Sequence, residues 1–303
     1  MHWILIALAA PALWSASNHI DKYLVGRYFK SGPGAVIIVS AFIGAACLPF
    51  ILLVEPHVFS INKTDALITI INGILLVIGT ILYLHALETH EASEVVPLFQ
   101  TTPLILFVLG YIFLGETLTI RQGIGGLLII AGAILISLAM KGGSFKLRWN
   151  LLGLMTLSSL ALAVSAILFK KVALEENFWI SAFWGWSGSI VAGFFCFAFV
   201  PSYRRAFLGI FSGASRASAT ALVAVNEFLD IIATLFFRYA GVIAPLALVQ
   251  VINGFQPIFV LILGIMLSVF FPSFGKEDML KTHLARKTAA ICMVVVGAIL
   301  IGA

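Results

Sequence analysis

The sequence predicts an all-α integral membrane protein with ten transmembrane helices, arranged as two inverted five-helix repeats. Three observations predict this fold class. Of the 303 residues, 61% are hydrophobic and only 10% are charged, whereas a soluble domain carries about 25% charged residues. The apolar residues gather in runs long enough to cross a bilayer. The second half of the chain also repeats residues of the first half in the same order.

A transmembrane helix needs roughly 20 predominantly apolar residues to cross about 30 Å of hydrocarbon. Ten such runs follow one another along the chain, at residues 3–25, 34–54, 66–87, 94–114, 120–139, 151–172, 179–200, 217–239, 243–270 and 285–302. The first run has small residues at a spacing typical of signal-peptide cleavage. It lacks a basic leading segment, so we expect it to remain as a span.

Charge and cysteine content narrow the class of protein. The net charge of +5 comes without a basic run of interleaved aromatics, so no nucleic-acid partner is expected. The loops after the odd-numbered spans hold 13 of the 18 lysines and arginines, which favours a cytoplasmic position for these loops. The cysteines, Cys47, Cys196 and Cys292, lie singly in three different spans and predict neither a disulfide framework nor a metal site.

The internal repeat divides the chain into residues 1–140 and 150–303. Identical residues recur at offsets of 148, 154 and 165. The matched pairs include Ser17 with Ser165, Lys22 with Lys170, Asn72 with Asn226, Pro103 with Pro257, and Arg121 with Arg286. Each half holds five spans, an odd number, so the second half must enter the membrane in the opposite orientation. Inverted repeats of this kind are typical of carriers that alternate access around a site at the midplane.

Residues 91–137 carry a resemblance to a known family. Small residues lead to Pro97 and Pro103, and Gly115-Glu116 follows the fourth span. This stretch resembles the EamA-type half of the drug/metabolite transporter superfamily. The resemblance implies a ten-span secondary transporter, commonly an exporter of metabolites, and leaves the substrate open. The second half departs from the pattern, because its Gly-Glu step is displaced to Gly275 and Glu277.

Glu227 and Asp230 are the most informative polar residues, because they lie near the middle of an apolar span. They are three residues apart, so they share a helix face. An ionised carboxylate at the bilayer centre costs at least about 2.5 kcal/mol. We therefore predict a site that binds protons or a cationic group. The alternative is a structural ion pair with lysines of neighbouring spans, with Lys170, Lys171 and Lys22 as the candidates.

The repeat separates these acids from the shared scaffold. Asn226 matches Asn72, but Glu227 aligns with Gly73, and Asp230 aligns with Leu76. A purely structural requirement would more often occur in both halves. The asparagines are therefore predicted to line the interior, and the two acids to serve a function that belongs to one half.

A stripe of amides and a related polar cluster are the next candidates for substrate contact. Gln250, Asn253 and Gln256 recur every three residues before Pro257, and Gln100 precedes Pro103 in the corresponding span. Proline removes a backbone donor and opens the helix locally. These amides either line the substrate path or form hydrogen bonds between packed spans, and the sequence leaves both open.

Four further polar residues are interpreted from their places in the spans. Asn18 and Lys22 lie one turn apart in the first span, where Lys22 is either a site residue or an interfacial anchor. Glu116, with Arg121, is predicted to be structural, because an acid is favourable at the start of the fifth span. The acidic turn between spans 3 and 4 is expected to be a short solvated loop.

The function expected is secondary active transport of small polar metabolites, such as amines or amino acids, by alternating access. Protons are the candidate coupling ion. We expect no enzyme activity, because no catalytic residues, metal ligands or cofactor motif occur in a recognised spacing. The expected partners are a small-molecule substrate and the lipid bilayer, in a bacterial-type plasma membrane. The alternative is a non-transport membrane protein: an intramembrane enzyme, or a structural or signalling partner.

Overall fold

The protein is described by a computed structural model that covers residues 2–27, 34–90, 95, 98–141, 149–210, 216–270 and 284–302. No strand occurs among these residues, so the predicted all-helical class is confirmed. Their helices are α1 (His2–Arg27), α2 (Gly34–Val54), α3 (Lys63–Thr89), α5 (Thr102–Leu114), α6 (Ile120–Lys141), α7 (Trp149–Glu175), α8 (Phe178–Phe199), α9 (Pro201–Ile210), α10 (Arg216–Ile243), α11 (Leu246–Ile252), η1 (Asn253–Phe255), α12 (Gln256–Phe270) and α13 (Leu284–Gly302).

Six described segments are long and apolar enough to cross a membrane: His2–Ile20, Val36–Val54, Lys63–Thr89, Trp149–Glu175, Phe178–Phe199 and Leu246–Leu267. Three shorter apolar helices accompany them, Thr102–Leu114, Ile120–Leu135 and Ala289–Gly302. The helix α10 is in neither group, and it is the one that carries Glu227, Asp230 and Arg238. The chain is therefore a multi-pass membrane protein, and these three charged residues lie within α10.

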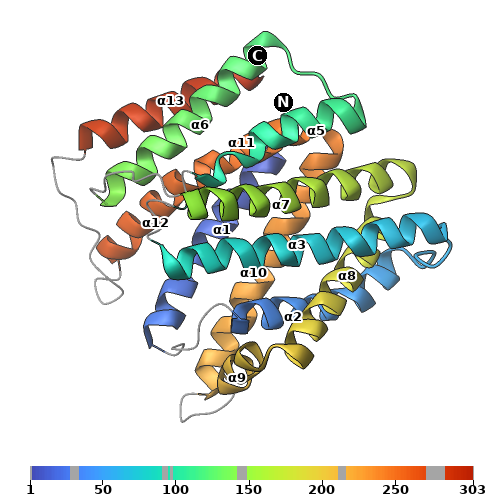
Figure 1. The fold of residues 1–303 in the computed structure, drawn as a ribbon. Helices are drawn as coiled ribbons and strands as arrows, with labels where there is room; N and C mark the ends of the chain where they lie inside the picture. Colours follow the sequence, from blue (N-terminus) through green and yellow to red (C-terminus); the bar gives the residue numbers. More distant parts are fainter. Residues whose placement is uncertain are drawn as a thin grey trace.

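The helices pack in pairs that join distant parts of the chain. The helix α6 lies beside α13 at one edge of the molecule, while α2 packs against α8 toward the opposite edge (Figure 1). Between these edges, α3 packs along α7, and α1 packs along α10. The two inner pairs carry the polar side chains described below.

The outer pair α6–α13 is held by backbone contact at glycines. A methyl group on Gly125 would lie 2.6 Å from the Gly297 carbonyl oxygen. A methyl group on Gly132 would lie 2.9 Å from the Ala290 carbonyl oxygen. Two helices can approach this closely only where small residues face one another. Gly125 and Gly132 thus allow the close packing of α6 against α13.

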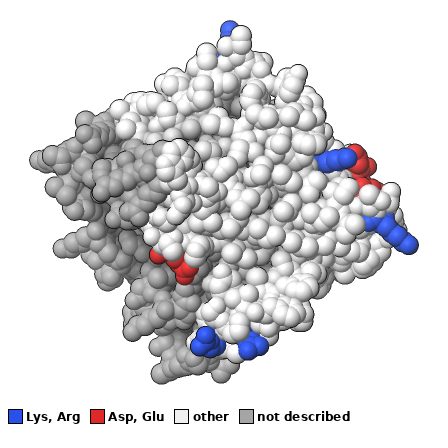
Figure 2. All heavy atoms as spheres, in the orientation of Figure 1, with Lys and Arg blue, Asp and Glu red and all other residues white. Residues whose placement is uncertain are grey.

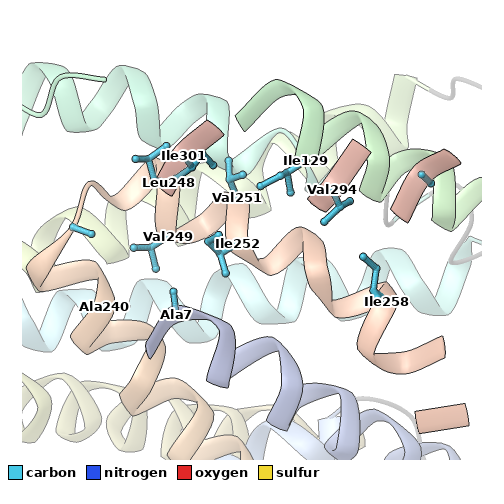
Figure 3. Packing of buried hydrophobic residues seen from close by; sticks show 12 residues of the cluster. Ala7, Ile129, Ala240, Leu248, Val249, Val251, Ile252, Ile258, Val294 and Ile301 are labelled. Atoms are coloured by element: carbon cyan, nitrogen blue, oxygen red, sulfur yellow. The ribbon is translucent and has the colours of Figure 1, made fainter. Parts of the chain in front are cut away.

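A buried hydrophobic cluster joins α11 to α6, α13 and α1. Val251 and Ile252 of α11 lie among Ile129 of α6, Val294 of α13 and Ala7 of α1 (Figure 3). These side chains are at most 4% exposed. The short α11 is therefore fixed within the bundle, which also positions the helix break that follows it.

Two helices are interrupted at the points that the prolines predict. A 3-10 turn at Asn253–Phe255 separates α11 from α12, directly before Pro257. In the first half, Gln100 and Thr101 form a turn directly before α5, which has Pro103 in its first turn. Broken helices expose backbone groups within the membrane only where they are buried in protein or line an aqueous path.

The surface agrees with a bilayer environment. On the described part of the face in Figure 2, charged side chains lie toward the margins and a broad uncharged area separates them. Large apolar side chains are exposed on many helices, such as Leu53 (82%) and Ile120 (83%). An exposed apolar area of this extent is unusual for a soluble monomer.

The helix α9 (Pro201–Ile210) was not predicted from the sequence, which placed these residues in a loop. It packs against α2, where Ala206 and Phe207 join a cluster with Val39. Arg204 and Arg205 of the same helix are exposed. An amphipathic pattern of this length is too short and too polar to resemble a span, which is why a search for apolar runs misses it.

Candidate functional site

The candidate site is built around α1, which lies between α10 and α12. On one side, Ser15 donates to the carbonyl of Gln256, and the His19 ring bonds the carbonyl of Val260. On the other side, Trp14 and Ser17 bond residues of α10. Polar side chains therefore link the first helix of the chain to two helices of the second half.

Asp230 is held by the first of these contacts. The indole Nε1 of Trp14 donates to Asp230 Oδ1 over 2.8 Å, and the carboxyl group is partly buried. The Trp14 ring also packs against Phe237, one to two turns further along α10, with centroids 5.6 Å apart. A hydrogen bond from a neutral donor stabilises the ionised carboxylate without neutralising it.

Glu227 is bonded from a different helix. Ser40 of α2 donates to Glu227 Oε1 over 3.0 Å, and Glu227 is only 5% exposed. The two acids share a helix face as predicted, but their described hydrogen bonds come from α1 and from α2. They are therefore two neighbouring carboxylates with separate donors.

Each of the two matched asparagines bonds the matched serine of a neighbouring helix, with opposite donor and acceptor roles. Asn72 of α3 donates to Ser165 Oγ of α7 over 2.9 Å. Asn226 of α10 accepts from Ser17 Oγ of α1 over 2.8 Å. Both asparagines are buried. Only Asn226 has the acids as near neighbours on its own helix.

The predicted amide stripe lies around the helix break. Gln250 is buried in α11, and Asn253 and Gln256 are partly buried at η1 and the start of α12. Gln100 is partly buried in the turn before α5. No described contact joins these four side chains to Glu227 or Asp230. Their role in substrate contact stays a prediction.

The predictions for α1 and the lysines have mixed outcomes. Asn18 is exposed, whereas its neighbour Ser17 is the residue that contacts α10. The side chain of Lys22 lies outside the described residues. Lys170 was considered as a partner of the acids of α10, but it pairs with Glu116 instead. Lys171 is exposed on α7.

Glu116 forms a buried polar cluster that the sequence did not predict. Gly115 ends α5 in the left-handed conformation, with φ of 65°, which glycine adopts without strain. The turn places the Glu116 carboxylate 2.7 Å from Lys170 Nζ, where it also accepts the Leu246 N–H over 2.9 Å. Lys170 in turn donates to the Ala244 carbonyl over 2.6 Å.

The prediction that Glu116 serves its own following helix, with Arg121, was wrong. Its carboxylate caps α11 of the second half, and Arg121 is exposed. The physical reason is that Leu246 begins a helix whose first N–H groups have no partners within it. A buried carboxylate beside a lysine satisfies one of them.

Ser40 and Arg238 were missed as polar residues of this region. A single serine in an apolar span carries no signal by itself. Arg238 is a buried charge on the same helix as the acids and is 9% exposed. Its position eight residues after Asp230 could have drawn attention to it. It was counted only as a basic residue near a loop.

The side chains gathered here are suited to binding. The described side chains offer two carboxylates, two amides, hydroxyls and an indole donor. Among the described residues, no group of three histidine, cysteine or acidic side chains could hold a metal ion. Carboxylates bind protons or cationic groups, and amides bind neutral polar groups.

Replacing Trp14 with phenylalanine tests the bond to Asp230. The variant keeps the ring packing against Phe237 but removes the N–H donor, which we expect to cost about 1–3 kcal/mol. Thermal unfolding of the purified protein in detergent measures the loss. The control is Trp149→Phe, at a residue that is 77% exposed. Equal melting temperatures for the two variants would show that the bond to Asp230 adds no stability.

Comparison with known proteins adds three findings. The model of the EamA-like transporter family matches residues 1–138. Over 122 residues the chain is 37% identical to an uncharacterized protein of Methanocaldococcus jannaschii, a stretch that is 39% of this chain and 89% of that protein. Over 135 residues it is 30% identical to an uncharacterized transporter of Clostridium kluyveri, which is 44% of this chain and 42% of that relative.

A solved crystal structure of another protein has the same fold. The two structures superpose with a TM-score of 0.72, covering 99% of this chain and 96% of the other. Their sequences are 17% identical, so the likeness concerns the fold alone.

Proposed function

This chain belongs to the EamA-like transporter family, and from that premise we propose that it is a secondary active transporter of small polar metabolites. It would work as an exporter by alternating access between two inverted five-helix halves. We further propose that Glu227 and Asp230 bind the cationic group of the substrate or a coupling proton. The family consists of membrane transporters rather than enzymes, so its substrate is a small molecule that crosses the bilayer.

The pattern of helix contacts supports the inverted repeat. If residues 1–140 and 150–303 are equivalent halves, α3 corresponds to α10, and α7 corresponds to α1. The packing of α3 on α7 then has its counterpart in the packing of α10 on α1. In each of these interfaces a matched asparagine and a matched serine are joined by hydrogen bonds.

The second helix of each half extends this correspondence. At an offset of 149, Ser40 of α2 matches Ser189 of α8. Ser189 donates to the Gly73 carbonyl of α3 over 3.3 Å, and Ser40 donates to Glu227 of α10 over 3.0 Å. Since Gly73 and Glu227 are themselves matched, equivalent serines contact equivalent positions. This agreement favours two structurally similar halves over chance identity between apolar helices.

The difference between the halves supports the role of the acids. The scaffold bonds recur in both halves, but Glu227 stands where the first half has Gly73, and Asp230 stands where it has Leu76. Ionisable residues within the membrane are costly and are usually kept for function. The single observation that carries the proposal is this pair of carboxylates, set into a duplicated framework of serine–asparagine bonds.

The substrate proposed first is an amine or an amino acid. Glu227 accepts a hydrogen bond from a hydroxyl, and Asp230 accepts one from an indole and also attracts Arg238 of the same helix, so the two acids outnumber this one arginine. Lys170, which could have supplied a positive charge, is taken by Glu116. A cationic or zwitterionic molecule would complement the carboxylates.

Counterflow into proteoliposomes tests the proposal. Vesicles that contain the purified protein and unlabelled compound are diluted into a trace of the labelled compound, with and without an imposed pH gradient. The compounds are four amino acids, each with the amine that lacks its carboxylate: L-alanine and ethylamine, L-serine and ethanolamine, L-lysine and cadaverine, L-tyrosine and tyramine. Saturable accumulation of at least one of these compounds is expected.

Glu227→Gln and Asp230→Asn are expected to lower the counterflow rate at least about tenfold, because the loss of one charged contact costs about 1.5–3 kcal/mol. The matched control is Glu175→Gln, an exposed carboxylate at the end of α7. Full activity of the Glu227 and Asp230 variants would remove the acids from the site. Flux that does not saturate would instead indicate a channel.

A further inference from the structure

The short helix α9 has a face that is fixed on the bundle. Tyr203, Ala206 and Phe207 are buried or partly buried, at the spacing of three and four residues that places side chains on one helix face. The Phe207 ring packs edge-on against Phe42 of α2 and Phe197 of α8, with centroids 5.8 and 5.9 Å apart. This face therefore holds α9 in place against two membrane-spanning helices.

The opposite face of α9 carries an apolar side chain between two arginines. Arg204, Arg205 and Leu208 are all exposed. On a helix of 3.6 residues per turn, Leu208 lies about 40° from Arg204 and about 60° from Arg205, on opposite sides. Arg205 Nε donates to the Pro201 carbonyl over 3.3 Å, which uses one of the five N–H donors of a guanidinium. These three side chains form one surface, the outer face of α9.

The end of α8 sets the level of α9 relative to the bilayer. The rings of Phe195 and Phe199 stack with centroids 5.6 Å apart, and the two residues are 56% and 72% exposed. At ten residues α9 is about 15 Å long, too short to cross about 30 Å of hydrocarbon. It lies beyond the lower end of α8 (Figure 1), and basic side chains occur at that margin (Figure 2). The helix α9 therefore lies where hydrocarbon gives way to lipid headgroups.

The charge around α9 is one-sided. Residues 178–226 contain no acidic residue and three arginines, Arg204, Arg205 and Arg216. The charge of Glu88, at the end of α3, reaches the Tyr203 phenol on the buried face of α9, and Glu88 lies 3.7 Å from His85 Nδ1. The helix follows the seventh predicted span, whose following loop was predicted to be cytoplasmic. The cytoplasmic leaflet is the one whose anionic lipids attract basic segments.

We propose that the outer face of α9 binds the anionic headgroups of the adjacent bilayer leaflet. The guanidinium groups of Arg204 and Arg205 would donate to lipid phosphates, for which their planar donors are suited. Leu208 would enter the boundary between headgroups and acyl chains. The inference requires a membrane protein and is independent of the substrate proposed above.

Binding at this face would act on the packing of α2 beneath it. Ala206 and Phe207 share a cluster with Val39 of α2, and the next residue, Ser40, donates to Glu227. A lipid that binds only the folded arrangement of α2 and α9 stabilises it by mass action. Anionic lipid should therefore raise the melting temperature of the whole protein.

Thermal unfolding of the full-length protein in detergent tests the proposal. Dioleoylphosphatidylglycerol or dioleoylphosphatidylcholine is added at equal concentration. The anionic lipid is expected to raise the melting temperature by about 2–4 °C more than the zwitterionic one. Arg204→Gln/Arg205→Gln should abolish this difference. Raising the salt concentration to about 0.5 M should reduce it in the wild type, because salt screens exposed charges.

Three further variants identify the cause of the difference. Lys63→Gln/Arg121→Gln removes the same charge from exposed residues at the starts of α3 and α6 and should leave the difference unchanged. Arg204→Lys/Arg205→Lys keeps the charge but loses the bond from Arg205 to Pro201, and it should retain most of the difference. Leu208→Gln should reduce the difference, because the apolar contact with lipid is lost.

Equal stabilisation of the wild type by the two lipids, or a difference that survives in Arg204→Gln/Arg205→Gln, would overturn the proposal. A difference lost equally in Lys63→Gln/Arg121→Gln would assign the effect to net charge and also overturn it. Inorganic phosphate at the same concentration should have no effect. Stabilisation by phosphate alone would indicate a site for a soluble anion instead of a membrane surface.

Light scattering of the same samples tests the other occupant of the outer face, a second copy of this chain. The mass of the protein–detergent complex should be the same for the wild type and for Arg204→Gln/Arg205→Gln. A smaller complex in the variant would mean that the arginines join two copies, and it would overturn the lipid assignment. The unfolding measurements need no substrate, so a failure of counterflow leaves their result unchanged.

Discussion

Lys170→Met is expected to lower the melting temperature of the protein, relative to wild type, by about 10 °C. The variant leaves Glu116 buried beside a partner that no longer carries charge, and breaking a buried ion pair in this way costs about 3–5 kcal/mol. It also removes the bond from Lys170 to the Ala244 carbonyl. The fall is measured by thermal unfolding in detergent, with tryptophan fluorescence as the signal.

The neighbouring lysine provides the control. Lys171 is exposed on the same helix, and Lys171→Met should leave the melting temperature within about 1–2 °C of wild type, as surface substitutions usually do. The double variant Glu116→Gln/Lys170→Met removes both charges and should recover part of the loss. A double variant no more stable than Lys170→Met would mean that the charge left on Glu116 is not the cause.

Gly73→Ala is expected to have the second large effect, by forcing α3 away from α8. The added methyl group would lie 1.9 Å from the Gly185 carbonyl oxygen and 2.6 Å from the Ser189 nitrogen. Both atoms belong to the backbone, so no side-chain rotation relieves the clash. Overpacking of this kind costs about 1–3 kcal/mol or more of stability. If the contact between α3 and α8 closes the transport path on one side of the membrane, the counterflow rate should also fall at least about tenfold.

Substitution of a glycine in open surroundings by alanine is expected to have the opposite effect on stability. Gly153 of α7 has nothing within 4 Å of the position that a methyl group would take. Gly153→Ala should therefore stabilise the protein by up to about 1 kcal/mol, because alanine favours the helix. Parallel unfolding curves of the two variants measure the contrast. A Gly73→Ala variant as stable and active as Gly153→Ala would show that α3 and α8 need not approach so closely.

The sequence predicted the location of most of the longer helices well, because six described segments are apolar runs of membrane length. It also predicted the breaks before Pro103 and Pro257, since proline interrupts a helix for a local reason. Asn72 and Asn226 were recognised as matched residues, and their bonds to Ser165 and Ser17 accord with that match.

The partners of the polar residues could not be predicted in the same way. An apolar helix that faces lipid on one side and protein on the other is hydrophobic all round, so its sequence does not reveal how it is rotated. Glu116 was therefore assigned to the helix that follows it, although its carboxylate caps α11. That contact joins residues 130 positions apart, and only the packing of the helices brings them together.

The exchange of Gly73 for Glu227 between the two halves has a consequence for the resting carrier. If the two halves alternate as proposed, the contact of α3 with α8 closes on bare backbone at Gly73, whereas the matched contact of α10 with α2 holds the Glu227 carboxylate and Ser40, so the two conformers would differ in energy. To invert a ratio of 1:99, cargo must bind the disfavoured conformer about 10⁴-fold more tightly. A carrier with this bias would rarely change conformation without substrate. Little of a proton gradient would then be lost through cycles of the unloaded carrier.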